Sequence, residues 1–282
     1  MKKLLLCTDL DRTLIPNGPQ PESVNARKWF DKLVNRDDVT LVYVTGRDKA
    51  LILNAIKNYQ LPMPDFVIAD VGSTIYHIEN THWHQVEKWD ADISGDWNSK
   101  SSNELQALLK DFRDIRLQEY SKQKVHKLSY YVPLYADHVN LMREINTCFT
   151  QQGIKASLIW SVDEAANIGL LDILPASANK KHAIEFLMNL YGFGLDETVF
   201  AGDSGNDISV MASSIHSVLV ANATDEVKES AYQAASTNNE TESLYIAKGD
   251  SLGMNGNYSA GIIEGVMYYI PVVRNWIGVQ DE

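Results

Sequence analysis

Leu4-Leu5-Leu6-Cys7-Thr8-Asp9-Leu10-Asp11-Arg12-Thr13 is an apolar run that ends in two carboxylates. Residues two apart in an extended chain point to the same side, so Asp9 and Asp11 share a direction if the run is a strand. Open α/β sheets bind their ligands at the carboxyl ends of strands. Two carboxylates aimed at one point repel each other unless a cation lies between them or one carries a proton. The stretch therefore predicts a reactive site; the alternative is one aspartate that caps a loop and one that is solvated.

The length, composition and net charge of the chain limit the classes of protein to which it can belong. The chain has 282 residues, of which 45% are hydrophobic and 22% charged, so it is long enough to bury a core in one large or two ordinary domains. Its formal net charge of -12 argues against a nucleic-acid or anionic-membrane partner. No apolar run approaches the roughly 18 residues of a membrane span, and Asp9 and Asp11 interrupt the first run before it could complete a signal peptide. We therefore expect a cytoplasmic protein.

Strand and helix patterns alternate on both sides of a central segment. The continuous apolar runs 39–44 and 66–69 predict buried strands, and helical spacing of apolar residues over 22–35 and 51–59 predicts helices before them. The pattern resumes with helices over 180–191, 225–235 and 258–269 and strands over 198–201 and 217–221. Buried strands that alternate with helices are typical of a parallel sheet covered on both faces.

Residues 80–174 have a different pattern. Residues 127–132 alternate as a one-sided strand does, helices are predicted over 102–112 and 138–150, and strands over 156–160 and 169–174. The fold class is therefore α/β, with a Rossmann-like parallel-sheet core interrupted by an inserted α+β cap. We predict that residues 1–79 and 175–282 form the core and that residues 80–174 form the cap.

Polar groups end three of the predicted core strands: Asp9 and Asp11, Thr45-Gly46-Arg47, and Asp203 with Asp207. Because the carboxyl ends of parallel strands meet at one edge of a sheet, we expect these groups to converge. Lys180 begins a predicted helix, where its ammonium and the helix N-terminus both favour a phosphate. Carboxylates suit a hard cation, and backbone N–H groups suit phosphate oxygens. Together they predict a phosphoryl-transfer site.

Four motifs carry a resemblance to a known family. Asp9-Leu10-Asp11-Arg12-Thr13 resembles the first motif (DxDxT) of the haloacid-dehalogenase-like phosphatases, Thr45 the second, Lys180 the third, and residues 202–207 the fourth, of GDxxxD type. The resemblance covers both core pieces and implies an insertion between the second and third motifs. A cap at that point is of the C2 type, and an α+β cap resembles subclass IIB. Lys181 stands where that subclass usually has glycine, so Lys181 remains an alternative to Lys180.

The resemblance implies a catalytic mechanism with an aspartyl-phosphate intermediate. Asp9 would be the nucleophile, Asp11 would protonate the leaving oxygen and then deprotonate water, and Lys180 would neutralise developing charge. Mg²⁺ would be the cofactor, held by Asp9, by the backbone carbonyl of Asp11 and by Asp203. Asp207 would either bind the metal directly or hold one of its ligands in place.

The resemblance also implies how the substrate is held. Thr45 and the N–H of Gly46 would bind the phosphoryl oxygens, assisted by Asn206. Arg47 would pair with a carboxylate and orient the loop, with direct substrate contact as the alternative. Lys127 would bind the substrate from the cap, or it is a solvated strand residue. We expect three tryptophans to pack in the interior of the cap; the alternative is that they form a stacking surface for a sugar. They are Trp83, Trp89 and Trp97.

Three further stretches resemble sucrose-phosphate phosphatases: His126–Val132, Leu171–Pro175 and Gly256–Glu264. Mannosylfructose-phosphate phosphatases share them. Ser161–Gly169 departs from the first family, being longer and more acidic than its compact link, which leaves the sugar open. The expected substrate is sucrose 6-phosphate; the alternatives are another phosphosugar, such as mannosylfructose phosphate, or a non-catalytic sugar-phosphate-binding module. We expect a monomer that binds neither nucleic acid nor membrane.

Overall fold

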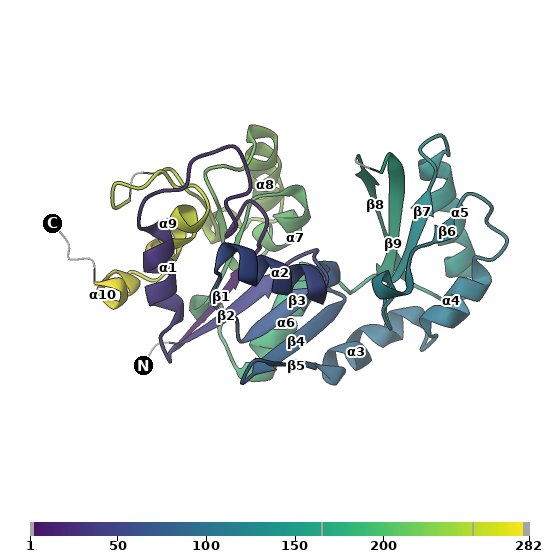
Figure 1. Cartoon of the computed structure of the whole chain (residues 1–282), viewed down its shortest axis with the longest axis horizontal. Helices are drawn as coiled ribbons and strands as arrows, with labels where there is room; N and C mark the ends of the chain where they lie inside the picture. Colours follow the sequence, from purple (N-terminus) through teal and green to yellow (C-terminus); the bar gives the residue numbers. More distant parts are fainter. Residues whose placement is uncertain (1–2, 165, 250, 279–282) are drawn as a thin grey trace.

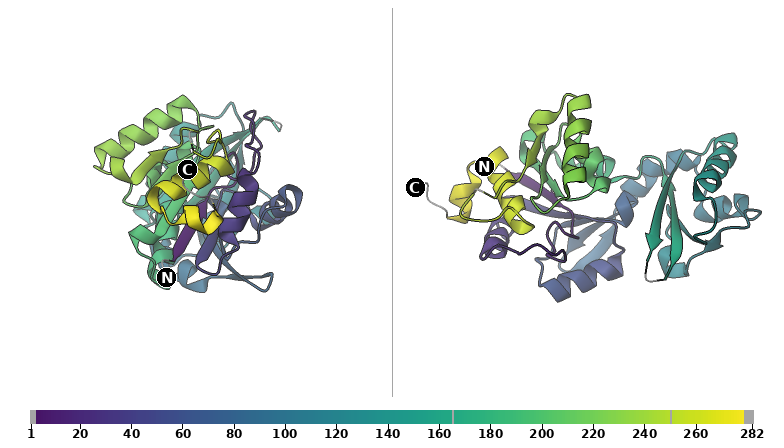
Figure 2. Two further views of the ribbon diagram at one scale, coloured as in Figure 1. Left: turned by 90° about the vertical axis from the view of Figure 1, so that its left-hand side faces the viewer. Right: turned by 90° about the horizontal axis from the view of Figure 1, so that it is seen from above.

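The computed structural model describes residues 3–164, 166–249 and 251–278. The first two and last four residues of the predicted core therefore lie outside the described residues. Two sheets organise the rest, one of eight strands and one of four. Figure 1 shows the smaller sheet and its helices to one side of the larger sheet, and Figures 1 and 2 place the first and last core helices at the far end from it.

The larger sheet forms the core and has the strand order β12-β11-β10-β1-β2-β3-β4-β5. Its strands are β1 (Leu4–Thr8), β2 (Val39–Val44), β3 (Phe66–Ala69), β4 (Thr74–Glu79), β5 (His82–Gln85), β10 (Thr198–Gly202), β11 (His216–Leu219) and β12 (Leu244–Ile246). From β12 to β3 all neighbours are parallel, whereas β4 and β5 pair antiparallel at one edge. All five residues of β1 are buried, as a strand covered on both faces requires. The predicted α/β class with a mainly parallel sheet is confirmed.

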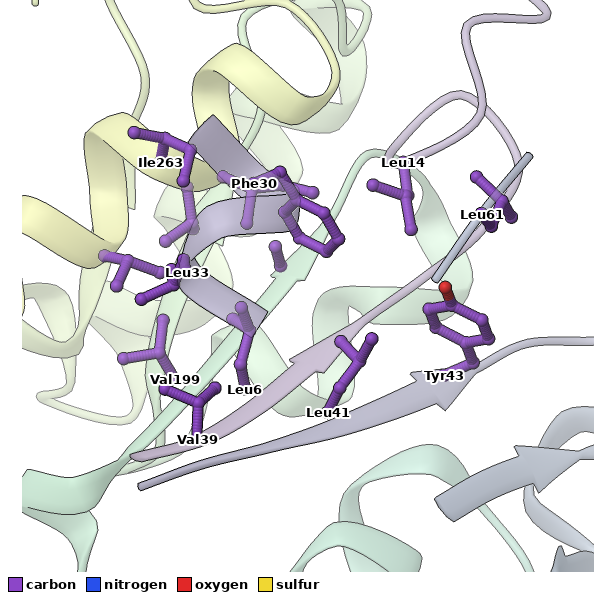
Figure 3. Close-up of a cluster of buried hydrophobic side chains, with 14 of the residues drawn as sticks. Leu6, Leu14, Phe30, Leu33, Val39, Leu41, Tyr43, Leu61, Val199 and Ile263 are labelled. Carbon is purple, nitrogen blue, oxygen red and sulfur yellow. The ribbon is translucent and has the colours of Figure 1, made fainter. Parts of the chain in front are cut away.

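Helices cover both faces of this sheet. The first face carries α1 (Ala26–Val34), α2 (Lys49–Tyr59), α9 (Ser259–Tyr269) and α10 (Val273–Ile277); the second carries α3 (Glu87–Ser94), α6 (Lys180–Tyr191), α7 (Ile208–Met211) and α8 (Asp225–Thr237). Figure 3 shows Phe30 of α1 and Ile263 of α9 against Leu6 and Leu41 of the strands. Alternate residues of β1 serve the two faces, since Leu6 packs in the first cluster and Cys7 in the second.

The smaller sheet forms the cap, with the antiparallel order β6-β7-β9-β8. Its elements are α4 (Ser102–Leu108), β6 (Arg116–Leu117), β7 (Leu128–Val132), α5 (His138–Gln151), β8 (Ala156–Asp163) and β9 (Ile168–Pro175). Leu128, Tyr130 and Val132 face the two helices in one hydrophobic cluster, whereas Ser129 between them bonds to Asp172 of β9. The cap sheet is therefore apolar on its helix side, whereas its other side combines the polar Ser129 and Asp172 with Ile159 and Leu174, which pack against the core.

The predicted cap limit at residue 80 differs from the structure. His82–Gln85 pairs with β4 as the last strand of the core sheet, and Trp83 packs against the core. Trp89 is fully buried in the second core cluster, so of the three tryptophans predicted for the cap interior Trp97 is the one that lies there. The reason is that β5 is an edge strand with three exposed residues of four, so it lacks the apolar pattern of the other core strands.

Two helices differ from their predictions in detail. α1 begins at Ala26 rather than at residue 22, and α2 begins at Lys49, two residues before the predicted start. Of Ser161–Gly169, the stretch that departs from the resembling family, residues 161–163 end β8 and residues 168–169 begin β9, whereas residue 165 lies outside the described residues. Across the described segments, no helix combines the length and apolar character needed to cross a bilayer.

Candidate active site

The expected convergence of strand ends occurs. β1 lies between β10 and β2 in the sheet, and all three run parallel. Asp9 therefore follows the central strand, with Thr45 after β2 on one side and Asp203 after β10 on the other. All three side chains are buried, with 5%, 1% and 5% of their surfaces exposed, respectively. Residues that are far apart in sequence thus meet at one edge of the sheet.

Three buried carboxylates gather at this edge: Asp9, Asp203 and Asp207 each offer an oxygen within 4.8 Å of the others. Burial, opposed by Lys180, raises the pKa of Asp9 to about 7, and burial together with the charge of Asp207 raises that of Asp203 to about 6. Such raised pKa values reflect a cluster short of positive charge. Oxygen ligands of this kind fit a hard divalent cation, so the residues suit Mg²⁺.

Lys180 is the cation of this cluster. Its side chain is 2% exposed, and its Nζ lies 2.6 Å from Asp207 Oδ1, 3.3 Å from Asp9 Oδ2 and 3.0 Å from Asn206 Oδ1. Burial alone would lower the pKa of Lys180, but Asp207 and Asp9 together raise it to about 12. Lys181 instead pairs with Glu185 on the surface. The alternative register is therefore wrong, and Lys180 is the lysine at the site.

Both carboxylate oxygens of Asp207 accept hydrogen bonds. Its Oδ1 accepts from Lys180, and its Oδ2 accepts from the backbone N–H groups of Asp203 and Ser204 and from the Ser204 hydroxyl, each at 3.1 Å. A Cβ on Gly202 would lie 2.5 Å from the Asp207 carboxylate, so only glycine leaves room for this arrangement. Asp207 thereby fixes both the lysine and the loop that carries Asp203.

The carboxylate of Asp11 accepts hydrogen bonds from Arg47 and Asn17. Arg47 donates to both of its oxygens at 2.6 and 2.7 Å, and Asn17 Nδ2 donates at 2.8 Å. Burial alone would raise the pKa of Asp11, but these hydrogen bonds and the Arg47 charge hold it below its usual range. The predicted pairing of Arg47 with a carboxylate is confirmed, and that carboxylate is Asp11.

Sequence reasoning missed the residues that hold Asp203. Thr13 Oγ1 donates to Asp203 at 3.2 Å, and Arg12 Nε lies 3.4 Å from its other oxygen. Asn222 accepts from Arg12 and donates to the Arg12 carbonyl at 2.6 Å, and its Oδ1 accepts from the N–H of Tyr258. Arg12 and Thr13 lie inside the first motif, so their position was a signal; nothing in the pattern singles out Asn222.

The predicted substrate-binding residues lie in two places. Thr45, Gly46, Arg47 and Asn206 lie at the core edge, where Gly46 is exposed and a Cβ there would meet only Val71, at 3.6 Å. Lys127 belongs to the cap, directly before β7, where it lies 3.5 Å from Asp70 and 3.3 Å from Asp172. It is 7% exposed, so it is not a solvated strand residue.

Comparison with known proteins agrees with this geometry. The model of the family described as sucrose-6F-phosphate phosphohydrolase matches residues 2–270. The chain belongs to this family. The match takes in both core pieces and the cap, so the resemblance found from the four motifs is confirmed, and so is the prediction of a phosphatase.

The proteins that are similar in sequence to this chain are described under several different names. A protein of Nitrosococcus oceani described as a HAD-like hydrolase is 50% identical over 98% of this chain and 74% of its own length. Sucrose-phosphatase 2 of Nicotiana tabacum is 27% identical over 94% of this chain, which spans 58% of the tobacco protein. Mannosylfructose-phosphate phosphatase of Agrobacterium fabrum is 28% identical, with 83% and 89% covered. The chain thus spans little more than half the length of its curated plant relatives.

A solved structure matches both sheets. The sucrose-phosphatase of Synechocystis, determined with sucrose and phosphate, aligns with a TM-score of 0.69 and 25% identity. The alignment covers 96% of this chain and 99% of the Synechocystis chain. Core and cap together are therefore shared with a phosphatase of this family.

Proposed function

We propose that the protein is a Mg²⁺-dependent phosphatase of a sugar phosphate, with sucrose 6-phosphate as its first candidate substrate. The observation that carries this proposal is the position of Lys180 between Asp9 and Asp207, beside Asp203. Among the described residues, the buried Lys180 and the partly exposed Arg12, which lies 3.4 Å from Asp203, are the cations that pair with these three carboxylates, which leaves negative charge that a divalent metal would balance. Asp9 and Asp203 with the carbonyl of Asp11 would hold Mg²⁺, which when bound neutralises phosphate charge.

Asp9 is the nucleophile in this proposal. Its Oδ1 is held by the N–H of Leu10 at 2.7 Å, and its Oδ2 lies near Lys180. An Asp9 oxygen attacks phosphorus, the bond from phosphorus to the sugar oxygen breaks, and that oxygen leaves with a proton from Asp11. Asp11 then takes a proton from water, whose oxygen attacks phosphorus and releases phosphate from Asp9. Both side chains return to their starting state.

Arg47 must release Asp11 before that proton transfer. In the structure, two hydrogen bonds from Arg47 keep the pKa of Asp11 low, whereas a proton donor needs a higher one. An incoming phosphate competes for the guanidinium, because Arg binds phosphate and carboxylate through the same donors. Thr45 and the N–H of Gly46, with Asn206, would hold the remaining phosphoryl oxygens.

Asp207 acts through its neighbours rather than as a direct metal ligand. Its two oxygens already accept from Lys180 and from the Asp203–Ser204 loop, as described above. It therefore orients the lysine and the loop that presents Asp203. This arrangement is complete, which favours a catalytic protein over a module that only binds sugar phosphates.

Mannosylfructose phosphate is the second candidate substrate. The phosphatase named for it is 28% identical and is covered over 89% of its length, against 58% of the tobacco sucrose-phosphatase. Both compounds are disaccharide phosphates, and Lys127 beside Asp172 of the cap sheet is the residue that we assign to their sugar half.

A phosphate-release screen with Mg²⁺ tests the function. Sucrose 6-phosphate, mannosylfructose phosphate and simple hexose phosphates are compared by kcat/KM, with a preference for one disaccharide phosphate as the expected result. Absence of release from every phosphosugar would sink the proposed activity. Comparable rates on all of them would refute selection by the cap.

A further inference from the structure

The three-residue turn Asp70–Gly72 follows β3 and precedes β4, at the edge of the core where Thr45 and Asp9 lie (the phosphate edge). Asp70 and Val71 have φ angles of 51° and 61°, in the left-handed region. That conformation is strained for a β-branched residue and persists only where surrounding contacts enforce it. Here the N–H of Asp70 donates to the Arg47 carbonyl at 3.1 Å, and that of Val71 donates to the Thr45 carbonyl at 3.2 Å. The turn is thus bonded to the loop that would hold the phosphoryl oxygens.

The end of the turn also packs against the helix that carries Lys180. Gly72 has a φ of 103°, and a Cβ there would lie 2.5 Å from the backbone of Asn179, which caps α6 directly before Lys180. Trp89 Nε1 donates to the Gly72 carbonyl at 3.1 Å. The turn therefore has a fixed place relative to two parts of the catalytic edge.

The side chain of Asp70 points out of the core toward the cap lysine. It is 1% exposed, its Oδ1 lies 3.5 Å from Lys127 Nζ, and its Oδ2 has no hydrogen-bond partner among the residues that the structure describes. A buried carboxylate is costly without a nearby cation. Lys127 supplies that cation, although Asp172 of β9 also lies 3.3 Å from it. One ammonium is therefore shared between a core carboxylate and a cap carboxylate.

We propose that Asp70 is a positioning residue for substrate binding: its carboxylate holds the Lys127 ammonium toward the phosphate edge and so sets the affinity for the sugar half of the substrate. This inference rests on the proposed function, which assigns Lys127 to the sugar. Asp172 lies in the same sheet as β7 and belongs to the cap with the lysine. Among the residues that the structure describes, Asp70 is the core residue that pairs with this ammonium, so without its charge the lysine relaxes toward Asp172.

Asp70→Asn tests the inference with little change in shape, because asparagine tolerates the left-handed region as aspartate does. We expect the KM for the sugar phosphate to rise about tenfold while kcat stays within about twofold, as for an interaction that serves binding. The KM for para-nitrophenyl phosphate, which carries no sugar, should not change. A purely structural role would change kcat and would affect both substrates.

A double-mutant cycle shows whether Asp70 acts through Lys127. Lys127→Gln should raise the KM for the sugar phosphate at least as much, and adding Asp70→Asn to it should raise the KM no further. Additive effects of the two substitutions would overturn the inference. Asp48→Asn is the matched control, because Asp48 also pairs with a cap lysine, Lys122, at 3.0 Å. Asparagine keeps the N-cap of α2, so this variant should retain the wild-type KM.

Acetylation of lysines without substrate provides a readout that needs no turnover. With acetic anhydride and mass spectrometry, Lys127 should react several-fold faster in Asp70→Asn than in the wild type, and Asp48→Asn should leave its rate unchanged. An active wild type combined with an unchanged KM and labelling rate in Asp70→Asn would refute the inference alone. An inactive wild type would refute the proposed function, and the labelling rates would still decide whether Asp70 holds Lys127.

Discussion

The edge of the core where Asp9 and Lys180 lie (the catalytic edge) and the interior of the cap both bury polar side chains. The two regions differ in how those side chains are hydrogen-bonded. At the edge, the charged side chains of Asp9, Lys180 and Asp207 bond to one another or to backbone N–H groups, although Arg12 Nε and Asp70 Oδ2 beside them have no hydrogen-bond partner among the described residues. In the cap, three buried polar atoms lack a hydrogen-bond partner within the described parts of the chain: Trp97 Nε1, His126 Nδ1 and Tyr130 Oη. Fixed, satisfied charges suit a site that must stabilise a transition state. The cap interior serves packing, so recognition falls to a few polar groups on its other face.

The largest expected effect is at the nucleophile. Asp9→Asn removes the attacking carboxylate but keeps its size, so turnover should fall by at least about a thousandfold. The fold should remain, because the substitution removes one of three crowded carboxylates. Phosphate release and circular dichroism check both points. Wild-type activity in this variant would contradict the assignment of Asp9 as the nucleophile. It would also contradict the view that the bonded charges at the edge serve catalysis.

Lys180→Met should have the next largest effect. The buried carboxylates of Asp9 and Asp207 would lose their cation, so we expect about a hundredfold loss of kcat and about 3 kcal/mol loss in the free energy of unfolding. Urea denaturation and phosphate release measure the two losses. Lys181→Met is the matched control: Lys181 and its partner Glu185 are both partly exposed, so the substitution should be nearly neutral. Equal effects at the two positions would contradict the geometry of the site.

The crowding of carboxylates also predicts how pH affects the metal-free protein. Asp9 and Asp203 have pKa values raised from 3.8 to about 7 and about 6, so between about pH 4 and pH 7 the folded state binds more protons than the unfolded state. The free energy of unfolding therefore falls as the pH rises through that window. In EDTA, Tm should be lower at about pH 8 than at about pH 5.

Added Mg²⁺ should reverse this loss where the carboxylates are ionised. We expect it to raise Tm by several degrees at about pH 8 and by little at about pH 5, because binding to the folded state alone stabilises it. Asp203→Asn should reduce both the pH dependence and the effect of Mg²⁺. An equal rise at both pH values would argue against a metal site built from these carboxylates.

Much of the site was predictable because its chemistry lies in local motifs at strand ends. Asp9, Thr45 and Asp203 follow continuous apolar runs, and parallel pairing brings such ends together whatever their separation in sequence. The sequence also favoured Lys180 over Lys181, because Lys180 lies three and four residues before Ala183 and Ile184 on the predicted apolar face of the helix. The choice depends on which face of α6 is buried, since the two residues point in different directions on one helix turn.

Contacts between distant segments could not be predicted in the same way. The pairing of Arg12 with Asp203 depends on a left-handed φ of 57° at Arg12, which no periodicity shows. Asp70 lies in a turn with no motif, and its role depends on where the cap places Lys127. Of the core hairpin formed by β4 and β5, the predicted boundary at residue 80 places only β5 in the cap, because an exposed edge strand resembles the half-exposed strands of the cap sheet.

The smallest predicted effect is a difference in stability between variants of two tryptophans. Trp89 lies in the core and bonds to Gly72, and Trp97 lies in the cap interior. Trp89 and Trp97 are both fully buried, but Trp89 Nε1 donates to the Gly72 carbonyl whereas Trp97 Nε1 has no hydrogen-bond partner in residues 3–164, 166–249 and 251–278. Phenylalanine removes the N–H and leaves a similar small cavity in each case. Trp89→Phe should therefore cost about 1 kcal/mol more than Trp97→Phe in the free energy of unfolding, the usual net contribution of one hydrogen bond.

Denaturation of the two variants side by side measures this difference, because the cavity contributions largely cancel. Trp89→Phe should also lower turnover slightly, since Gly72 ends the turn that is bonded to the Thr45 loop, whereas Trp97→Phe should not. If Trp97→Phe proved the more costly, its indole N–H would have a partner in solution, for example a buried water. The cap interior would then satisfy its polar groups as the catalytic edge does, and the contrast between the two regions would rest on charge alone.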